Sequence, residues 1–202
     1  MRALILDYGE VLSLPQPPEF AEAMAATVGV PRDTFDAAYW RHRRAYDLGL
    51  PAADYWTATL RDLGVTATSN IPALIDLDIR SWTQYREPMW TAAAAARAAG
   101  VRTAILSNGV PEIMARVRLE RTLGATFDVV VVSCEVGCAK PDPEIYRLTL
   151  SQLHAAPEHA VFVDDRAENI DAARQLGLRT VHFSGDERMA QFHSRLTEEL
   201  SK

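Results

Sequence analysis

Hydrophobic residues along the chain fall into short apolar runs and longer stretches with helical periodicity. The short runs lack the apolar–polar alternation of a half-exposed strand, so they predict strands buried on both faces of a parallel sheet. They span residues 3–6, 102–106, 127–132, 160–163 and 179–183. Helical patterns at residues 90–99, 112–123, 143–154 and 167–176 separate the later runs. This order predicts a doubly wound, Rossmann-like α/β fold with a parallel sheet of about five strands.

The pattern changes between residues 14 and 85, where no strand-like run occurs. Helical periodicity there covers residues 20–28, 32–46, 52–63 and 71–82. Pro15, Pro17 and Pro18 mark the start of this segment, and residues 86–88 mark its end, because such residues favour extended or turn backbone. The prediction is a four-helix cap at residues 14–85, inserted into a core made of residues 1–13 and 86–202.

Composition narrows the functional classes. The chain has 202 residues and a formal net charge of −6, which argues against a nucleic-acid-binding surface. No stretch of about 18 residues is free of charge, so we expect no contact with a membrane; the amino terminus lacks a secretory signal, so we expect a cytoplasmic protein. Cys134 and Cys138 have poor spacing for zinc and are expected to be buried thiols. The oligomeric state is left open.

Polar residues gather where the predicted strands end. The first strand is followed by Asp7, the second by Ser107, and the fourth by Asp164 and Asp165, while Lys140 lies in the loop after the third. In an open α/β sheet, ligands bind beyond the carboxyl ends of the strands. The sequence therefore predicts one site that contains a hydroxyl, a lysine and three carboxylates.

Four motifs carry this chemistry: LILDYGEVL, ILSNG, AKPDPEIY and VFVDDRAEN. In this order, and with a helical insert just after the first, they resemble the haloacid dehalogenase-like superfamily. The resemblance spans essentially the whole core. Its Asp-x-Gly first motif is similar to that of a subset that includes bacterial glucose-1-phosphate phosphatase. The resemblance implies magnesium-dependent hydrolysis of a small phosphate monoester through a phosphorylated Asp7.

The resemblance also implies a role for each matching residue. Asp7 is the nucleophile, Ser107 contacts a phosphoryl oxygen, and Lys140 neutralises the phosphoryl group and orients Asp7. Further phosphoryl donors are Asn108 and the backbone amides of Tyr8, Gly9 and Gly109. The expected ligands of Mg²⁺ are the side chains of Asp7, Asp164 and Asp165 with the backbone carbonyl of Gly9. Asn169 is expected to tie the loop of Asp165 to the side of the site that holds the phosphate and Lys140.

One position departs from the family pattern. Most phosphatases of the superfamily carry an aspartate two residues after the nucleophile as general acid and base, and this chain has Gly9 there. Such a group contributes roughly a hundred- to ten-thousandfold in rate, so its loss favours a leaving oxygen of low basicity, as in a sugar 1-phosphate or an aryl phosphate. Glu10 in a short flap and His42 in the cap are the candidates to supply the proton instead.

The cap is expected to select the substrate, a small phosphorylated metabolite. Its most polar and aromatic stretch is residues 39–47, where a helix would place Arg43 and Tyr46 to contact a sugar or aryl phosphate. The alternative is an amphipathic helix whose aromatic side chains pack within the cap and whose arginines are solvated.

Two other functions stay open. A protein that binds magnesium and phosphate but turns over very little would explain Gly9. A 2-haloacid dehalogenase also lacks the second aspartate, but these enzymes need no metal and lack paired acids after the fourth strand. Retention of Asp7 together with Asp164 and Asp165 favours the phosphatase over both.

Overall fold

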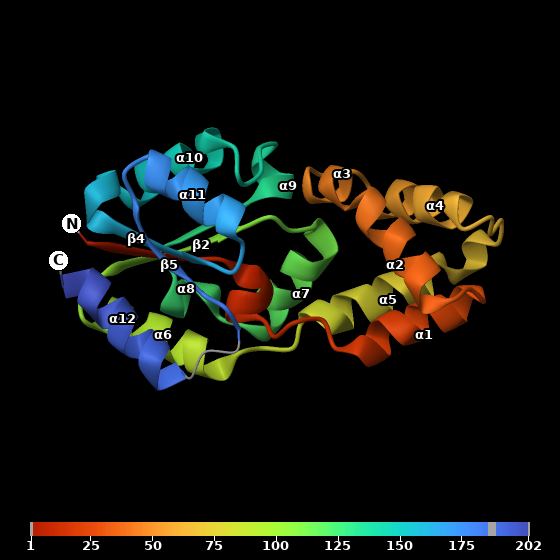
Figure 1. Ribbon diagram of the computed structural model, residues 1–202, viewed down its shortest axis with the longest axis horizontal. Helices are drawn as coiled ribbons and strands as arrows, with labels where there is room; N and C mark the ends of the chain where they lie inside the picture. The colour runs from red at the N-terminus through yellow and green to blue at the C-terminus, as the bar shows by residue number, and fades with distance from the viewer. Residues whose placement is uncertain (1, 186–188, 202) are drawn as a thin grey trace.

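The computed structural model describes residues 2–185 and 189–201; residues 186–188 and the two ends of the predicted core, residues 1 and 202, lie outside the description. Five strands form one parallel sheet in the order β3-β2-β1-β4-β5 (Figure 1). The strands are β1 Ala3–Leu6, β2 Arg102–Ser107, β3 Val129–Val132, β4 Ala160–Asp164 and β5 Arg179–His182. The predicted α/β fold class is confirmed.

Apolar runs form these strands because helices cover both faces of the sheet, and every residue of β1 and β4 is buried. One face packs against α6 (Glu87–Ala98), α7 (Pro111–Glu120) and α12 (Met189–Ser201). The other packs against α10 (Pro143–Leu153) and α11 (Ala167–Gln175), which lie above the sheet in Figure 1. Because β1 lies between β2 and β4, the carboxyl ends of these three strands meet in the middle of one edge.

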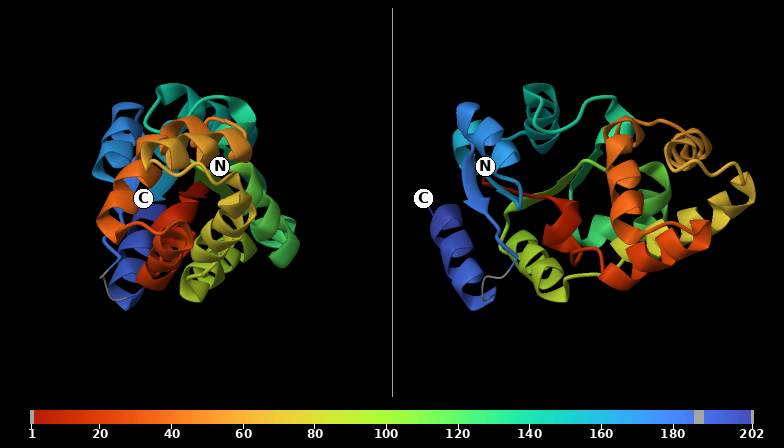
Figure 2. Two further views of the ribbon diagram at one scale, coloured as in Figure 1. Left: turned by 90° about the vertical axis from the view of Figure 1, so that its right-hand side faces the viewer. Right: turned by 45° about the vertical axis from the view of Figure 1, so that its right-hand side comes forward.

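The segment between β1 and α6 is helical. It holds α1 (Pro18–Val28), α2 (Arg32–Arg41), α3 (Arg43–Asp47), α4 (Ala52–Asp62) and α5 (Ile71–Trp82), with a 3₁₀ turn at Thr68–Asn70. The right-hand view of Figure 2 shows these helices, coloured orange to yellow, gathered at the end of the molecule opposite the C-terminus. There α5 packs against α7. An antiparallel bridge between Ser13 and Tyr85 brings the two connections of this segment side by side. The rings of Phe35, Tyr39 and Trp56 pack on one another inside it.

The prediction of one helix over residues 32–46 is wrong. The helix breaks at His42, whose backbone N–H donates to Trp40 O, and a separate helix α3 follows. Both Arg43 and Tyr46 are buried after this break. Arg43 pairs with Asp78 of α5, and Tyr46 donates a hydrogen bond to Glu112 of α7. Tertiary contacts of this kind can outweigh the continuous helical periodicity of the sequence.

Two further boundaries differ from the prediction. Residues 86–88 do not form an extended exit, because α6 begins at Glu87 with Pro88 in its first turn, where the missing N–H breaks no helical bond. The helix expected over residues 112–123 ends at Glu120, and a separate short helix α8 (Leu123–Thr126) follows.

Several short elements have no counterpart in the prediction. They are a π-helical turn at Tyr8–Leu12, α9 (Ser133–Val136), a 3₁₀ turn at Pro157–His159, and the last helix α12. Cys134 and Cys138 are free thiols, but they are only partly buried because they lie in and after α9, beyond the end of β3. Across residues 2–185 and 189–201, no helix is both long and apolar enough to cross a bilayer.

We expect Phe162→Ala to lower the free energy of unfolding by about 3–5 kcal/mol, because it opens a cavity in the middle of the sheet. The Phe162 side chain is fully buried in β4, and its ring meets Tyr146 edge to face with centroids 5.5 Å apart. Urea unfolding measures the change. Leu119→Ala is the control, because that side chain is 84% exposed and its loss should change the value by less than about 0.5 kcal/mol. Equal effects of both variants would contradict the assigned core.

Candidate active site

The site is organised around a buried lysine. Lys140 Nζ lies 2.7 Å from Asp7 Oδ1 and 2.7 Å from Asp164 Oδ2. Asp7 directly follows β1 and Asp164 ends β4, and the two neighbouring parallel strands bring both carboxylates to one edge. Burial lowers the pKa of Lys140, but the two carboxylates more than offset this and hold it above its ordinary value. The ammonium is therefore charged and paired on both sides.

A third carboxylate completes an acidic cluster. Carboxylate oxygens of Asp7, Asp164 and Asp165 lie within 4.8 Å of one another. Burial raises the pKa of Asp165 to about 6, and the nearby Asp164 and Glu10 add to the effect. Burial also raises the pKa of Asp7, and Lys140 offsets only part of this.

The acidic cluster fits a hard divalent cation. Three carboxylates face a single ammonium, so the cluster has an excess of negative charge that favours a cation. Carboxylate oxygens are the ligands that Mg²⁺ prefers. Asp7 and Asp165 can reach a cation in the pocket, because both line it together with Gly9. Asp164 is fully buried behind them.

Asp164 is held by several donors at once. Besides Lys140, it accepts hydrogen bonds from Asn169 Nδ2 at 3.0 and 3.1 Å and from the backbone N–H of Arg166 at 2.8 Å. Asn169 therefore acts on Lys140 through Asp164, and its own backbone carbonyl accepts a hydrogen bond from Tyr146. The structure thus places Asn169 next to the Lys140 side of the site.

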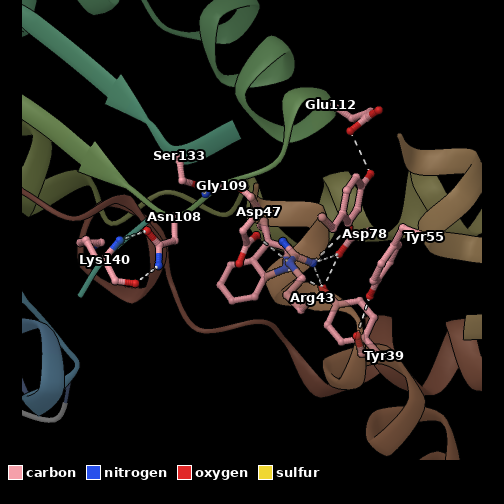
Figure 3. Close-up of polar contacts among 12 residues, drawn as sticks. Tyr39, Arg43, Asp47, Tyr55, Asp78, Asn108, Gly109, Glu112, Ser133 and Lys140 are labelled. Carbon is pink, nitrogen blue, oxygen red and sulfur yellow. Dashed lines mark hydrogen bonds and ion pairs between the residues drawn. The ribbon is translucent and has the colours of Figure 1, made fainter. Parts of the chain in front are cut away.

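Asn108 fixes the loop that carries Lys140. Its Oδ1 accepts a hydrogen bond from the Lys140 backbone N–H at 2.8 Å, and its Nδ2 donates to the Lys140 carbonyl at 2.9 Å (Figure 3). The sequence predicted a direct phosphoryl donor here. The side chain pairs with the backbone of Lys140, and both Asn108 and the neighbouring Ser107 line the pocket.

Two backbone amides expected to face a phosphate have other acceptors. The N–H of Gly109 donates to Ser133 Oγ at 3.1 Å, and the N–H of Tyr8 donates to Asp7 Oδ1 at 2.6 Å. Ser133 in turn donates to the carbonyl of Asp47 in α3 (Figure 3). Sequence reasoning missed Ser133, although it is the first polar residue after β3 and the rule applied to the other strands would have found it.

The π-helical turn after Asp7 forms a flap over the site. Glu10 has a left-handed backbone conformation with φ 56°, which is strained for a residue other than glycine. Its carbonyl accepts a hydrogen bond from Arg86 at 3.1 Å, and the residue lines the pocket. Gly9 has an ordinary φ of −61°, and a Cβ there would meet only the Trp82 ring, at 3.9 Å. Neither space nor backbone requires glycine at this position.

The structure corrects two residues predicted in the cap. His42 Nε2 lies 2.9 Å from Asp62 Oδ2, and His42 is not among the residues that line the pocket, so it is not placed to act as an acid or base. Tyr46 is buried, does not line the pocket, and donates from its hydroxyl to Glu112 at 2.8 Å. Glu112 lies in the first turn of α7, so this hydrogen bond connects the helical segment to a helix that packs on the sheet.

The pocket lies between the strand ends and the helical segment. Arg43 reaches it as predicted, but its guanidinium already contacts Asp47, Asp78 and Tyr39 (Figure 3). Trp40 and Asp47, which also line it, belong to the stretch of residues 39–47 that the sequence singled out. Sequence reasoning missed the other lining residues, which are Trp82, Ile113, Met114 and Arg166.

Residues 1–177 match the haloacid dehalogenase-like hydrolase family, and the chain belongs to this family. It is 38% identical to bifunctional epoxide hydrolase 2 of Rattus norvegicus over 100 residues, which are 46% of this chain and 18% of that protein. It is 38% identical to a phosphoserine phosphatase of Thermus thermophilus over 89 residues, 44% of this chain and 36% of that one. Protein CbbY of Cereibacter sphaeroides is 31% identical over 170 residues, 81% and 66% of the two chains. The chain thus spans only part of each relative.

Solved structures share the fold. A HAD family enzyme of Bacteroides thetaiotaomicron, in complex with magnesium and inorganic phosphate, has a TM-score of 0.78 and 18% identity, covering 95% of this chain and 98% of that one. A dehalogenase has a TM-score of 0.73 and 20% identity, covering 100% and 98%. At these identities the likeness shows the fold and does not separate the two reactions.

We expect Asn108→Ala to destabilise the protein by about 1–3 kcal/mol, because it leaves the backbone N–H and C=O of Lys140 without their partners. Urea unfolding measures this loss. Asn70→Ala is the matched control, since that amide makes a single hydrogen bond, to the carbonyl of Thr27, in a part of the helical segment remote from the pocket. If Asn108→Ala costs no more than the control, the two bonds to Lys140 do not hold its loop.

Proposed function

We propose that the chain hydrolyses a small phosphate monoester through an aspartyl-phosphate intermediate on Asp7, with Mg²⁺ as cofactor. The observation that carries the proposal is the Lys140 ammonium held between Asp7 and Asp164, with Asp165 beside them in a pocket that Ser107 also lines. In this proposal residues 14–85 form the cap domain, and residues 1–13 and 86–202 form the core.

The proposed reaction has two steps. A carboxylate oxygen of Asp7 attacks phosphorus, the bond from phosphorus to the leaving oxygen breaks with its electron pair, and that oxygen takes up a proton. Water then attacks the phosphorus of the aspartyl phosphate, loses a proton, and releases inorganic phosphate with the Asp7 carboxylate restored. Lys140 and Ser107 hold phosphoryl oxygens during both steps.

Asp7 and Asp165 would hold the magnesium ion, with Asp164 behind them and the carbonyl of Gly9 as the family resemblance implies. When bound, the ion supplies positive charge next to the phosphoryl oxygens. The excess of carboxylates over ammonium groups supports this assignment. Phosphoserine phosphatase among the relatives supports phosphate chemistry, and the paired acids Asp164 and Asp165 at the end of β4 favour it over halide displacement.

Glu10 is the candidate to move the proton that the family aspartate would otherwise move. It lines the pocket, whereas His42 faces Asp62 outside it. Gly9 and the resemblance of the first motif to the glucose-1-phosphate phosphatase subset together support a sugar or aryl phosphate, whose leaving oxygen needs little protonation.

We expect Asp7→Asn to abolish turnover of an aryl phosphate, by a factor on the order of 10⁴ or more, because the amide cannot form the acyl phosphate. Phosphate release is measured with Mg²⁺, and treatment of the wild type with EDTA should stop turnover until Mg²⁺ is restored. Asp171→Asn is the control, since that carboxylate is exposed and pairs with Arg174 at 3.2 Å. Turnover by Asp7→Asn at the wild-type rate would refute the nucleophile. A wild type that binds Mg²⁺ and phosphate without turnover would instead favour the binding protein.

We expect the rate of the wild type to rise steeply along a series of aryl phosphates as the leaving oxygen becomes less basic, since Gly9 provides no acid. Gly9→Asp should flatten this dependence by speeding the poor leaving groups about ten- to a hundredfold. Gly9→Ala is the control, because it fills the same space 3.9 Å from Trp82 without an acid and should leave the slope unchanged.

A shallow slope in the wild type would contradict the expectation for Gly9 and assign the proton to another group. Glu10→Gln tests that group directly: it should then slow the poor leaving groups far more than the good ones. Steady-state rates across the same ester series measure both outcomes.

A further inference from the structure

Each cation among the described residues that line the pocket already has a carboxylate partner. Lys140 pairs with Asp7 and Asp164 at 2.7 Å, Arg43 with Asp47 at 3.2 Å and Asp78 at 3.4 Å, and Arg166 with Glu168 at 2.6 Å. In the proposed reaction Lys140 serves the transferred phosphoryl group. The part of the pocket that receives the leaving group therefore offers no cation without a partner.

Arg43 lines the pocket from α3, and two carboxylates balance the charge of its guanidinium. Its side chain is only 10% exposed, and its guanidinium faces Asp47 and Asp78 at the same time (Figure 3). The guanidinium also lies over the rings of Tyr39, Tyr46 and Trp82, at 5.3, 5.6 and 5.8 Å from their centroids. One guanidinium and two carboxylates leave a net negative charge at this wall.

Glu10 adds further negative charge to the pocket lining. Glu10 lines the pocket from the flap and lies near enough to raise the pKa of Asp165, after burial and Asp164. Arg166 also lines the pocket and lies near enough to Asp47 to lower the pKa of that carboxyl, against the larger effect of burial, but its guanidinium is exposed and paired with Glu168 at 2.6 Å. A leaving group with its own phosphate or carboxylate would therefore meet like charge from both Asp47 and Glu10.

Two indole rings provide the uncharged surface. Trp40 and Trp82 line the pocket with ring centroids 6.4 Å apart and planes at 85°, and Trp40 is 52% exposed. Ile113 and Met114 line it from α7. The Trp82 ring also lies beside Gly9, where no side chain separates it from the reacting end of the pocket. Apolar and aromatic walls of this kind bind the faces of rings.

We propose that the leaving group is a ring without negative charge that sits against Trp40 and Trp82, and that Asp47 excludes esters with a second phosphate or a carboxylate. The inference rests on the proposed phosphatase function, because a leaving group exists only if the chain hydrolyses a phosphate ester. Specificity here is set by a repulsive element as well as by the contact to the ring.

The test uses two aryl phosphates that differ only in a methyl ester or a carboxylate on the ring. Their Kd values are measured by calorimetry on Asp7→Asn, which holds the esters without turnover, and kcat/KM is measured on the wild type. We expect the carboxylate to bind at least about tenfold more weakly, and the difference to appear in KM rather than kcat. Higher ionic strength should shrink the ratio, because the repulsion is electrostatic.

Asp47→Asn keeps the shape of the side chain and removes its charge, so it should bring the ratio of the two Kd values several-fold closer to one. Asp76→Asn is the matched control, because it makes the same charge change at a 56% exposed side chain of α5 that pairs with Arg80. Trp40→Ala should weaken both esters alike and leave the ratio unchanged.

Equal binding of the two esters to Asp7→Asn would overturn the inference. A ratio that persists in Asp47→Asn would overturn the role of Asp47, and unchanged binding of both esters in Trp40→Ala would overturn the contact to the ring. A wild type that hydrolyses neither ester while Asp7→Asn still discriminates between them would support charge selection by the pocket and refute the proposed phosphatase function.

Discussion

The arrangement of the site depends on one buried ammonium between two carboxylates. Asp7 and Asp164 end neighbouring parallel strands, so the topology of the sheet forces their negative charges together in a buried place. The Lys140 ammonium offsets the repulsion between the two carboxylates. Removing one partner of such a buried pair typically lowers the stability of a protein by about 3–5 kcal/mol. The lysine comes from the loop after β3 and is held there by Asn108 from the loop after β2. One lysine thus connects four strand ends, two through its charged side chain, one through its backbone and one through its own loop.

The walls of the pocket come from both parts of the chain, and a short chain of hydrogen bonds connects them. Ser133 accepts from the N–H of Gly109 at the sheet and donates to the carbonyl of Asp47 in α3. Tyr46 makes a second connection through Glu112. The backbone carbonyl of Asp47 is therefore held by Ser133 of the core, and its side chain is held by Arg43 of the helical segment.

The sequence was informative where one local pattern decides the structure. Strands covered on both faces read as apolar runs, and their ends place Asp7, Lys140 and Asp165 by topology alone. Prediction from the sequence failed where a side chain is held by a partner far away along the chain. Arg43, the first residue after the break at His42, is buried and pairs with Asp78, which lies 35 residues away along the chain. Tyr46 similarly depends on Glu112, 66 residues away. Periodicity alone holds no information on such pairs.

Gly9 is the position where local structure and chemistry can be separated. Its backbone angles suit any residue, and the space beside it would admit a side chain, so folding does not select the glycine. The surroundings supply a chemical reason. Asp7, Asp164 and Asp165 already crowd this end of the pocket, and Glu10 follows directly, so another carboxylate would increase the repulsion within the cluster. Because Gly9 has no side chain, the Trp82 ring lies next to the backbone that follows Asp7. In the proposed reaction the leaving group therefore meets an aromatic ring at the position where most phosphatases of the family carry an aspartate.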